Sequence, residues 1–166
     1  MTNTIQNEQD LAGVHLWLLL WKASRAVEAH STRSVAQFGM GTSDFGVLEA
    51  LLHKGQLTVK QLGEKVLLTS GSMTTAVDRL EARGLVTRHD DATDRRARII
   101  QLTPDGRKLI ECAFTRHREQ MEAALADFST EERASLLPLL RRLGRVADST
   151  FHATTQPTGA KGRREE

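Results

Sequence analysis

Hydrophobic positions along this chain recur mostly three and four residues apart, which predicts an architecture dominated by helices. The first helix is expected from about residue 9 to residue 37, a stretch without proline. Leu16, Leu20 and Val27 lie on one apolar stripe of this helix, and further apolar residues fill the positions between them. A helix that is apolar nearly all round must be buried on several sides, so we expect a second copy of the chain to cover it.

Three shorter helices are expected in the middle of the chain, over about residues 42–53, 59–67 and 70–83. Thr42 or Ser43 is placed to cap the first of them, and Thr58 the second. Gly55 and Gly84 follow the first and third helices, where glycine commonly ends a helix.

Two short β-like runs follow, over residues 85–89 and 98–102, and the polar segment 90–97 between them predicts a hairpin. Thr103 and Pro104 are suited to begin a fifth helix, which should reach about Phe128. Ser129 with Glu132 forms a capping-box pattern that opens a sixth helix to about Thr150.

These elements predict a mainly α fold with a small β-hairpin wing: a winged helix-turn-helix plus a helical dimerisation region, six helices in all. Residues 1–38 would be an N-terminal dimerisation helix and 42–103 the DNA-binding lobe. Residues 104–150 would be C-terminal dimerisation helices, and 152–166 a tail without apolar periodicity that we expect to be disordered.

The fourth predicted helix has the pattern of a DNA-recognition helix, because Met73 and Leu80 fall on an apolar side opposite a side of small and polar residues. Gly63, in the helix before it, predicts a close crossing of the two helices. At the hairpin tip Arg96 could enter a narrow minor groove, with Asp94 holding it extended. The residues expected to bind DNA are Ser43, Thr58, Thr69, Ser70, Gly71, Ser72, Thr74, Thr75, Arg79, Asp94, Arg95 and Arg96.

Charge supports this interpretation only locally, because the net charge of the chain is +2. Eight basic and five acidic residues lie between Arg79 and Lys108, a balance that favours phosphate contacts but is also compatible with a solvated loop. The N-terminal residues lack the basic region of a signal peptide, and the apolar run 16–21 is too short to cross a bilayer. We therefore expect a cytoplasmic protein without a membrane partner.

The sequence resembles the MarR family of bacterial regulators over about residues 10–150. The supporting strings are residues 42–48, 57–63, 77–86, 94–96 and 102–106, and residues 64–72 also resemble the hydroquinone-responsive MhqR branch. The resemblance implies a dimer joined by the first, fifth and sixth helices, a palindromic operator in double-stranded DNA, and Arg96 in the minor groove supported by Asp94. Thr75 departs from the pattern, because many members have a base-reading arginine there.

The resemblance also implies a small aromatic, phenolic or quinone effector that would release a repressor from DNA. Residues of the first helix combine apolar walls with polar groups, as an effector pocket requires, although both tryptophans could instead serve packing. The residues of this expected pocket are His15, Trp17, Trp21, Ser24, Arg25, Glu28 and, from the second helix, His53.

No catalytic residues, cofactor or metal site are expected. The six histidines are scattered and no nucleophile elbow or phosphate loop occurs. Cys112, the only cysteine, excludes an internal disulfide and is expected to be buried in the fifth helix. The alternative to a ligand-responsive repressor is a winged-helix module that binds DNA or protein without any small-molecule ligand.

Overall fold

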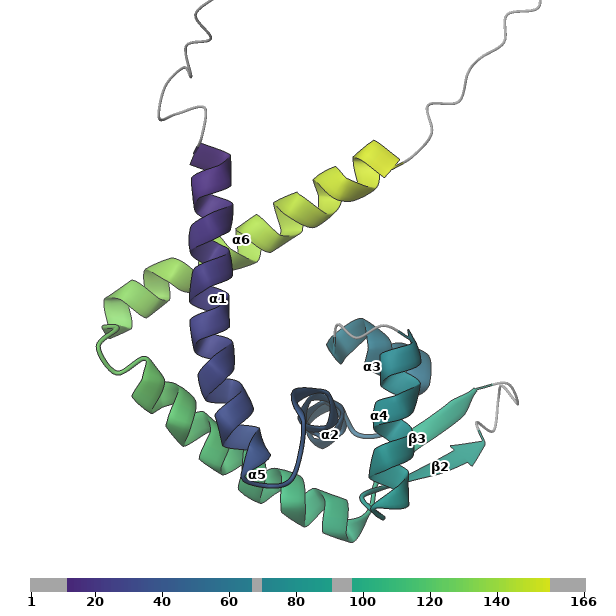
Figure 1. Ribbon diagram of the computed structural model, residues 1–166. Coiled ribbons are helices and arrows are strands. Elements are labelled where there is room, and N and C mark those ends of the chain that lie inside the picture. Colours follow the sequence, from purple (N-terminus) through teal and green to yellow (C-terminus); the bar gives the residue numbers. More distant parts are fainter. Residues whose placement is uncertain (1–11, 67–69, 91–96, 156–166) are drawn as a thin grey trace, which may run out of the picture. The chain divides into compact units, whose positions relative to one another are not determined.

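The computed structural model describes residues 12–66, 70–90 and 97–155 (Figure 1). The helices of this part of the chain are α1 (Ala12–Ala36), α2 (Thr42–Lys54), α3 (Val59–Val66), α4 (Ser70–Ala82), α5 (Pro104–Ala124) and α6 (Thr130–Thr155). The strands are β1 (Leu57–Thr58), β2 (Val86–Asp90) and β3 (Arg98–Leu102). The predicted mainly α fold with a small β wing is confirmed. The described residues form two compact units, one up to Ala124 and one from Leu125 onward.

The three strands form an antiparallel sheet in the order β1-β3-β2. β2 and β3 pair from Val86 opposite Leu102 to Asp90 opposite Arg98, which confirms the base of the predicted hairpin. β1 pairs with the other edge of β3, with Leu57 opposite Ile100. The sequence predicts the two hairpin strands but not this third strand.

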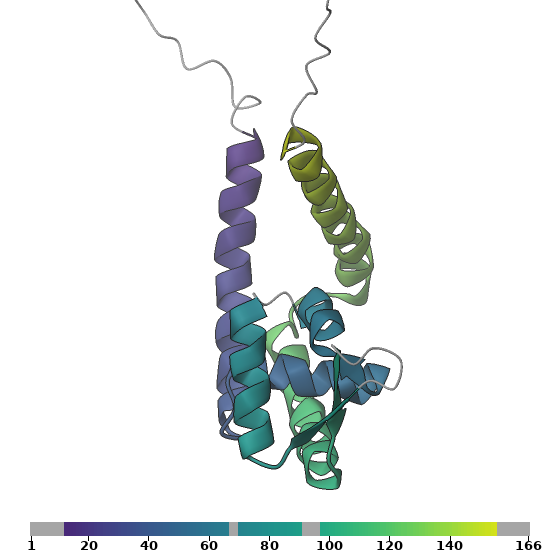
Figure 2. The same ribbon diagram turned by 90° about the vertical axis from the view of Figure 1, so that its right-hand side faces the viewer.

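The core of the first unit lies where α2, α3, α4 and α5 meet the sheet. Its largest fully buried side chains include Leu48, Leu51, Leu62, Met73, Leu80, Ile100 and Ile110. Both views show α1 extending away from α2–α4, with only its C-terminal end beside them (Figures 1 and 2). Accordingly, Ser34 and Val35 are the buried residues of α1.

Side-chain caps define several helix starts as predicted. Thr58 and Gln61 cap α3 reciprocally: the Gln61 amide donates to Thr58 Oγ1 at 3.2 Å, and the Thr58 amide donates to Gln61 Oε1 at 2.8 Å. Thr103 Oγ1 accepts the amide of Gly106 at 2.9 Å and so caps α5. The prediction for α2 is wrong, because Gly41 is its N-cap residue and no side chain caps it.

The two C-terminal helices differ from prediction at their ends. α5 ends at Ala124, earlier than the expected Phe128. Ser129 and Glu132 form the predicted capping box, with the Ser129 amide donating to Glu132 Oε2 at 2.7 Å. α6 continues to Thr155, so residues 152–155 of the expected tail are helical, and residues 156–166 lie outside the described part.

Two glycines mark close packing in the first unit, and neither is the one that the sequence suggested. A Cβ atom on Gly46 of α2 would lie 2.6 Å from Val66 Cγ1 of α3, and one on Gly106 would lie 1.9 Å from the Leu85 carbonyl oxygen. A Cβ on Gly63 would meet nothing within 4 Å, so the predicted close crossing at Gly63 is wrong.

The N-terminal two-thirds of α1 expose their apolar residues within the single chain, so the expected burial is not met by this chain alone. Trp17 is 61% exposed and Leu19 64% exposed, and Leu16, Leu20 and Trp21 are also exposed. In the second unit α6 likewise exposes Leu136, Leu137, Leu139, Leu140, Val146 and Phe151. No helix among the described residues combines the length and apolar character that a bilayer crossing needs.

Candidate nucleic-acid interface

α4 separates a packing face from a solvent face, as a recognition helix must. One side of the helix is completely buried and consists of Met73, Ala76, Val77 and Leu80. Gly71, Thr75 and Asp78 recur at helical spacing on the opposite side and are exposed. We call this solvent side the polar face of α4.

The hydroxyl residues predicted to bind DNA gather in the first half of α4. Thr75 Oγ1 donates to the Gly71 carbonyl at 3.0 Å, which leaves its lone pairs directed outward. Ser72 and Thr74 are exposed beside it. Ser70 begins the helix, its side chain is outside the described part, and Thr69 lies in the undescribed segment 67–69.

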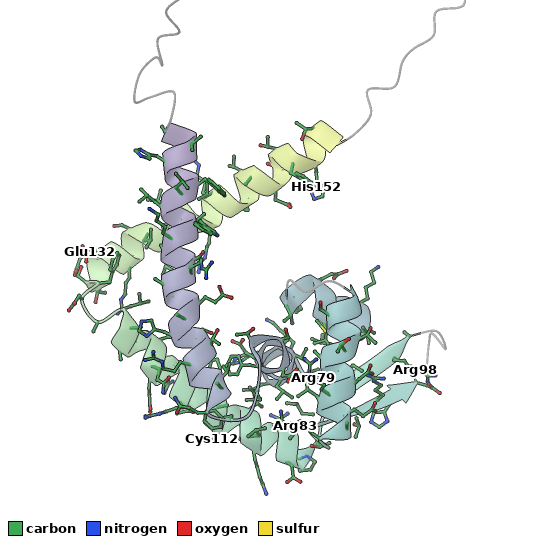
Figure 3. All side chains as sticks on the ribbon, viewed as in Figure 1. Arg79, Arg83, Arg98, Cys112, Glu132 and His152 are labelled. Carbon is green, nitrogen blue, oxygen red and sulfur yellow. The ribbon has the colours of Figure 1, made fainter. Side chains whose placement is uncertain are left out.

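Arg79 is held by a carboxylate that the sequence analysis did not identify. Arg79 Nη2 lies 2.6 Å from Asp44 Oδ1 of α2, and Figure 3 shows Arg79 between the two helices. The Asp44 side chain is only 7% exposed, whereas Arg79 is half exposed. The hydrogen bond from Arg79 to Asp44 and the charge of that carboxylate raise the pKa of Arg79 above its ordinary value. The pair therefore fixes α4 against α2 and keeps one side of the guanidinium open to solvent.

A second arginine fastens the end of the same helix. Arg83 Nη1 donates to the carbonyl oxygen of Gly39 at 2.9 Å. Gly39 has a φ of 63°, a conformation that glycine adopts without strain. The connection between α1 and α2 is thereby joined to the C-terminal end of α4.

Two of the remaining predicted DNA-binding residues, Ser43 and Thr58, are described by the structure. Ser43 is half-buried in the first turn of α2. Thr58 is also half-buried, and its hydroxyl is engaged with Gln61, so the structure assigns Thr58 a capping role. Arg98 and Asp90 pair at the end of β2 and β3 where the hairpin loop begins. Asp94, Arg95 and Arg96, which the sequence predicts for the tip, lie outside the described residues.

β2 contributes an arginine that reaches back to α4. Arg88 Nη2 is hydrogen-bonded to Asp78 Oδ1, and Arg88 Nε lies 3.3 Å from Glu81 Oε2. Thr87 and His89 point to the other side of the strand, where Thr87 Oγ1 and His89 Nε2 are 3.0 Å apart. Arg88 therefore connects β2 with α4.

The residues expected to form an effector pocket on α1 lie on its exposed surface. The rings of Trp17 and Trp21 stack with their centroids 6.5 Å apart, and Arg25 lies 5.7 Å above the Trp21 ring. Ser24 Oγ donates to the Trp21 carbonyl of its own helix. His15 and Glu28 are exposed as well. Within the single chain, these residues form a surface stripe.

A cavity of about 450 Å³ lies instead between α1, α2, α3 and α5. Of the residues expected for a pocket, only His53 contributes to it. Its lining is Ser31, Thr42, Phe45, Gly46, Glu49, Ala50, His53, Lys54, Lys65, Val66 and His117. Aromatic rings, two lysines, one glutamate and hydroxyl groups thus line this cavity, which is open to solvent.

Two histidines contribute aromatic rings to this cavity. The rings of Phe45 and His117 are 4.8 Å apart at 50°, and His117 Nδ1 lies 3.2 Å from the hydroxyl of the buried Ser34. His53 meets the Phe114 ring edge-on at 4.8 Å. The sequence did not indicate His117, because it comes from α5, far from α2 along the chain.

Cys112 is exposed, so the prediction that it is buried is wrong. The buried positions of α5 are Gly106, Ile110 and Ala113, and Cys112 is turned away from that side. Among the described residues, no three histidine, cysteine or acidic side chains gather as a metal ion would require.

The proteins that this chain resembles in sequence are transcriptional regulators. A model of the MarR family matches residues 38–97. The HTH-type transcriptional regulator MhqR of Bacillus subtilis (strain 168) is 35% identical over 137 residues, covering 82% of this chain and 94% of that protein. PecS of Dickeya dadantii (strain 3937), another HTH-type transcriptional regulator, is 27% identical and covers 83% of this chain and 87% of its own length.

Solved structures agree over most of the chain. BpsR of Bordetella bronchiseptica, whose DNA binding is regulated by 6-hydroxynicotinic acid, superposes with a TM-score of 0.72 at 25% identity, covering 78% of this chain and 98% of that one. The transcriptional regulator BldR of Sulfolobus solfataricus gives 0.71 at 27% identity, with 84% and 99% covered.

Proposed function

This chain belongs to the MarR family of DNA-binding transcriptional regulators, and we propose that it is a repressor released from a palindromic operator by a small aromatic, phenolic or quinone ligand. The observation that carries the proposal is the two-sided packing of α4: one side of the helix is fully buried, and its polar face is presented beside the hairpin. This is the arrangement that places a recognition helix in a major groove. The proposed function includes no enzymatic step.

The DNA contacts proposed for α4 are those of its small polar residues with phosphates and base edges. The exposed part of Arg79 is directed to a phosphate, while Asp44 restricts the conformations of its side chain. Arg96, supported by Asp94, is proposed to enter the adjoining minor groove. The helix would then contact the major groove while the wing contacts the adjoining minor groove.

A homodimer is proposed as the form that binds DNA. MarR-family regulators act as dimers, and the exposed apolar residues of α1 and α6 provide surface that a second protomer could bury. Two copies of α4 would then meet successive major grooves about 34 Å apart, which fits a palindromic operator.

The cavity between α1, α2, α3 and α5 is the better candidate for the effector site, and we propose it in place of the α1 stripe. Its volume of about 450 Å³ is within the range typical of small-molecule sites. Phe45 and His117 offer aromatic faces for a planar ring, and Lys54 or Lys65 could pair with a carboxylate or phenolate. The effect of 6-hydroxynicotinic acid on BpsR supports this ligand class.

A thermal-shift screen with aromatic acids, phenols and quinones, including 6-hydroxynicotinic acid, tests the ligand proposal. A compound that binds the folded protein at a hundred times its Kd stabilises it by about 2.7 kcal/mol and raises its melting temperature. The same compound should release the protein from an operator fragment in a fluorescence anisotropy assay.

Two variants separate the candidate pockets. Ala50→Phe places a ring inside the cavity and should abolish both responses. Glu28→Gln removes a charged group of the α1 stripe without altering its exposed apolar residues, and it should leave both responses unchanged. The reverse result would return the site to the α1 stripe. If no compound of the panel changes either readout, the chain is better described as a winged-helix module without a small-molecule ligand.

A further inference from the structure

The polar face of α4 has two carboxylates where a DNA duplex would approach. Asp78 follows Thr75 by one helical turn on this face, and Glu81 follows Asp78 by another. Their side chains are 55% and 41% exposed. Unpaired carboxylates at these positions would repel the phosphates of a bound duplex.

Basic residues within α4 do not offset this charge, because Arg79 is engaged with the buried Asp44. The compensating cation comes from the wing. Arg88 of β2 binds Asp78 through Nη2 and approaches Glu81 through Nε, so that one guanidinium faces both carboxylates.

The surroundings of Arg88 favour this role over a direct phosphate contact. Its side chain is 29% exposed, less than either carboxylate. Its Nε is shut off from solvent and has no hydrogen-bond partner among the described residues, since Glu81 lies near it without the alignment of a hydrogen bond. A buried donor cannot reach a phosphate, whereas its charge acts on both neighbouring carboxylates.

We propose that Arg88 is a positioning residue for DNA binding that acts by charge compensation. Its guanidinium neutralises Asp78 and Glu81, so that the polar face of α4 no longer repels the phosphate backbone. This inference rests on the proposed role of α4 as the recognition helix. It goes beyond that role by assigning to a wing residue an effect on the recognition helix that requires no contact with DNA.

The test uses a duplex enriched from a random pool by the unmodified full-length protein, with affinity measured by fluorescence anisotropy. Arg88→Met removes the cation while keeping the aliphatic stem, and it should weaken binding about tenfold. The triple variant D78N/E81Q/R88M removes the carboxylates as well and should bind within about threefold of the unmodified protein. D78N/E81Q alone should bind at least as tightly as the unmodified protein, because the charge of Arg88 is then uncompensated.

The outcomes distinguish the alternatives. If the triple variant binds as weakly as R88M although its circular dichroism melt is intact, charge compensation is overturned. A salt dependence reduced by about one phosphate contact would then assign Arg88 to the backbone of DNA. If the unmodified protein enriches no duplex at all, the proposed DNA-binding function of α4 fails, and this result is separate from the failure of the role assigned to Arg88.

Discussion

Replacing Leu16 and Leu20 together by aspartate is expected to convert the dimer into monomers and to lower operator affinity by about 100-fold or more. Both leucines lie on the exposed apolar stripe of α1, where a symmetric interface would place each substitution twice. Four carboxylates would then have to be desolvated in one interface, which costs several kcal/mol for each ion. A monomer would also lose the linkage between two half-sites, because each copy of α4 would bind independently.

Sedimentation velocity measures the oligomeric state of this variant, and fluorescence anisotropy its affinity for the operator. Thr32→Asp is the control for an added carboxylate, since it places an aspartate at an exposed position of the same helix outside the apolar stripe. A doubly substituted protein that sediments as a dimer and binds like the unmodified one would remove α1 from the proposed interface.

Gly106→Ala is expected to destabilise the first unit by about 3 kcal/mol, at the upper end of the usual cost of overpacking. The new Cβ would lie 1.9 Å from the carbonyl oxygen of Leu85. That oxygen already accepts the amide of Thr103 at 3.1 Å, and Thr103 Oγ1 donates to the carbonyl of Gly84 at 2.7 Å. The start of α5 therefore cannot move away from Leu85 without breaking the contacts that fix it.

For a chain of this size, the loss corresponds to a decrease in Tm of roughly 6–12 °C in thermal unfolding followed by circular dichroism. Gly63→Ala is the control: its Cβ meets nothing within 4 Å, and alanine in a helix interior is favoured over glycine by up to about 1 kcal/mol. Equal melting of Gly106→Ala and the unmodified protein would show that the approach of α5 to Leu85 is looser than the structure indicates.

Local signals predicted most of the fold. The caps formed by Thr58, Thr103 and Ser129 each involve a partner three residues away, so both members of each pair fall within one short segment of the sequence. The apolar period of α4 likewise predicted the fully buried set of residues that includes Met73 and Leu80. These features depend on the helical repeat and on short-range hydrogen bonds, which a single sequence displays directly.

Features that require distant elements to meet were missed. Asp44 and Arg79 are 35 positions apart, and His117 and Ser34 are 83 apart, so no local pattern connects them. The cavity proposed for the effector combines residues of four helices, whereas the sequence predicts a pocket formed by α1 residues and His53 of α2, and of these only His53 lines the cavity.

Two further predictions, the burial of Cys112 and the close crossing at Gly63, are wrong for different reasons. Cys112 was assigned to the interior because its neighbours are apolar, but it lies about 200° around the helix from the buried Ile110. Gly63 predicts a close crossing of α3 with α4, but the close approach of α3 is to α2, at Gly46. A glycine in a helix indicates close packing only when the position of the neighbouring helix is known.

Dimethyl sulfate probing of the operator complex shows whether the helix and the wing occupy adjoining grooves, because this reagent methylates guanine N7 in the major groove and adenine N3 in the minor groove. We expect two blocks of N7 protection about 34 Å apart, each flanked by N3 protection. Arg96→Ala should remove the N3 protection and weaken binding by about 1 kcal/mol or more, while Arg107→Ala on α5 should change neither. Full N3 protection and unchanged affinity in Arg96→Ala would contradict the proposed grip of helix and wing on adjoining grooves.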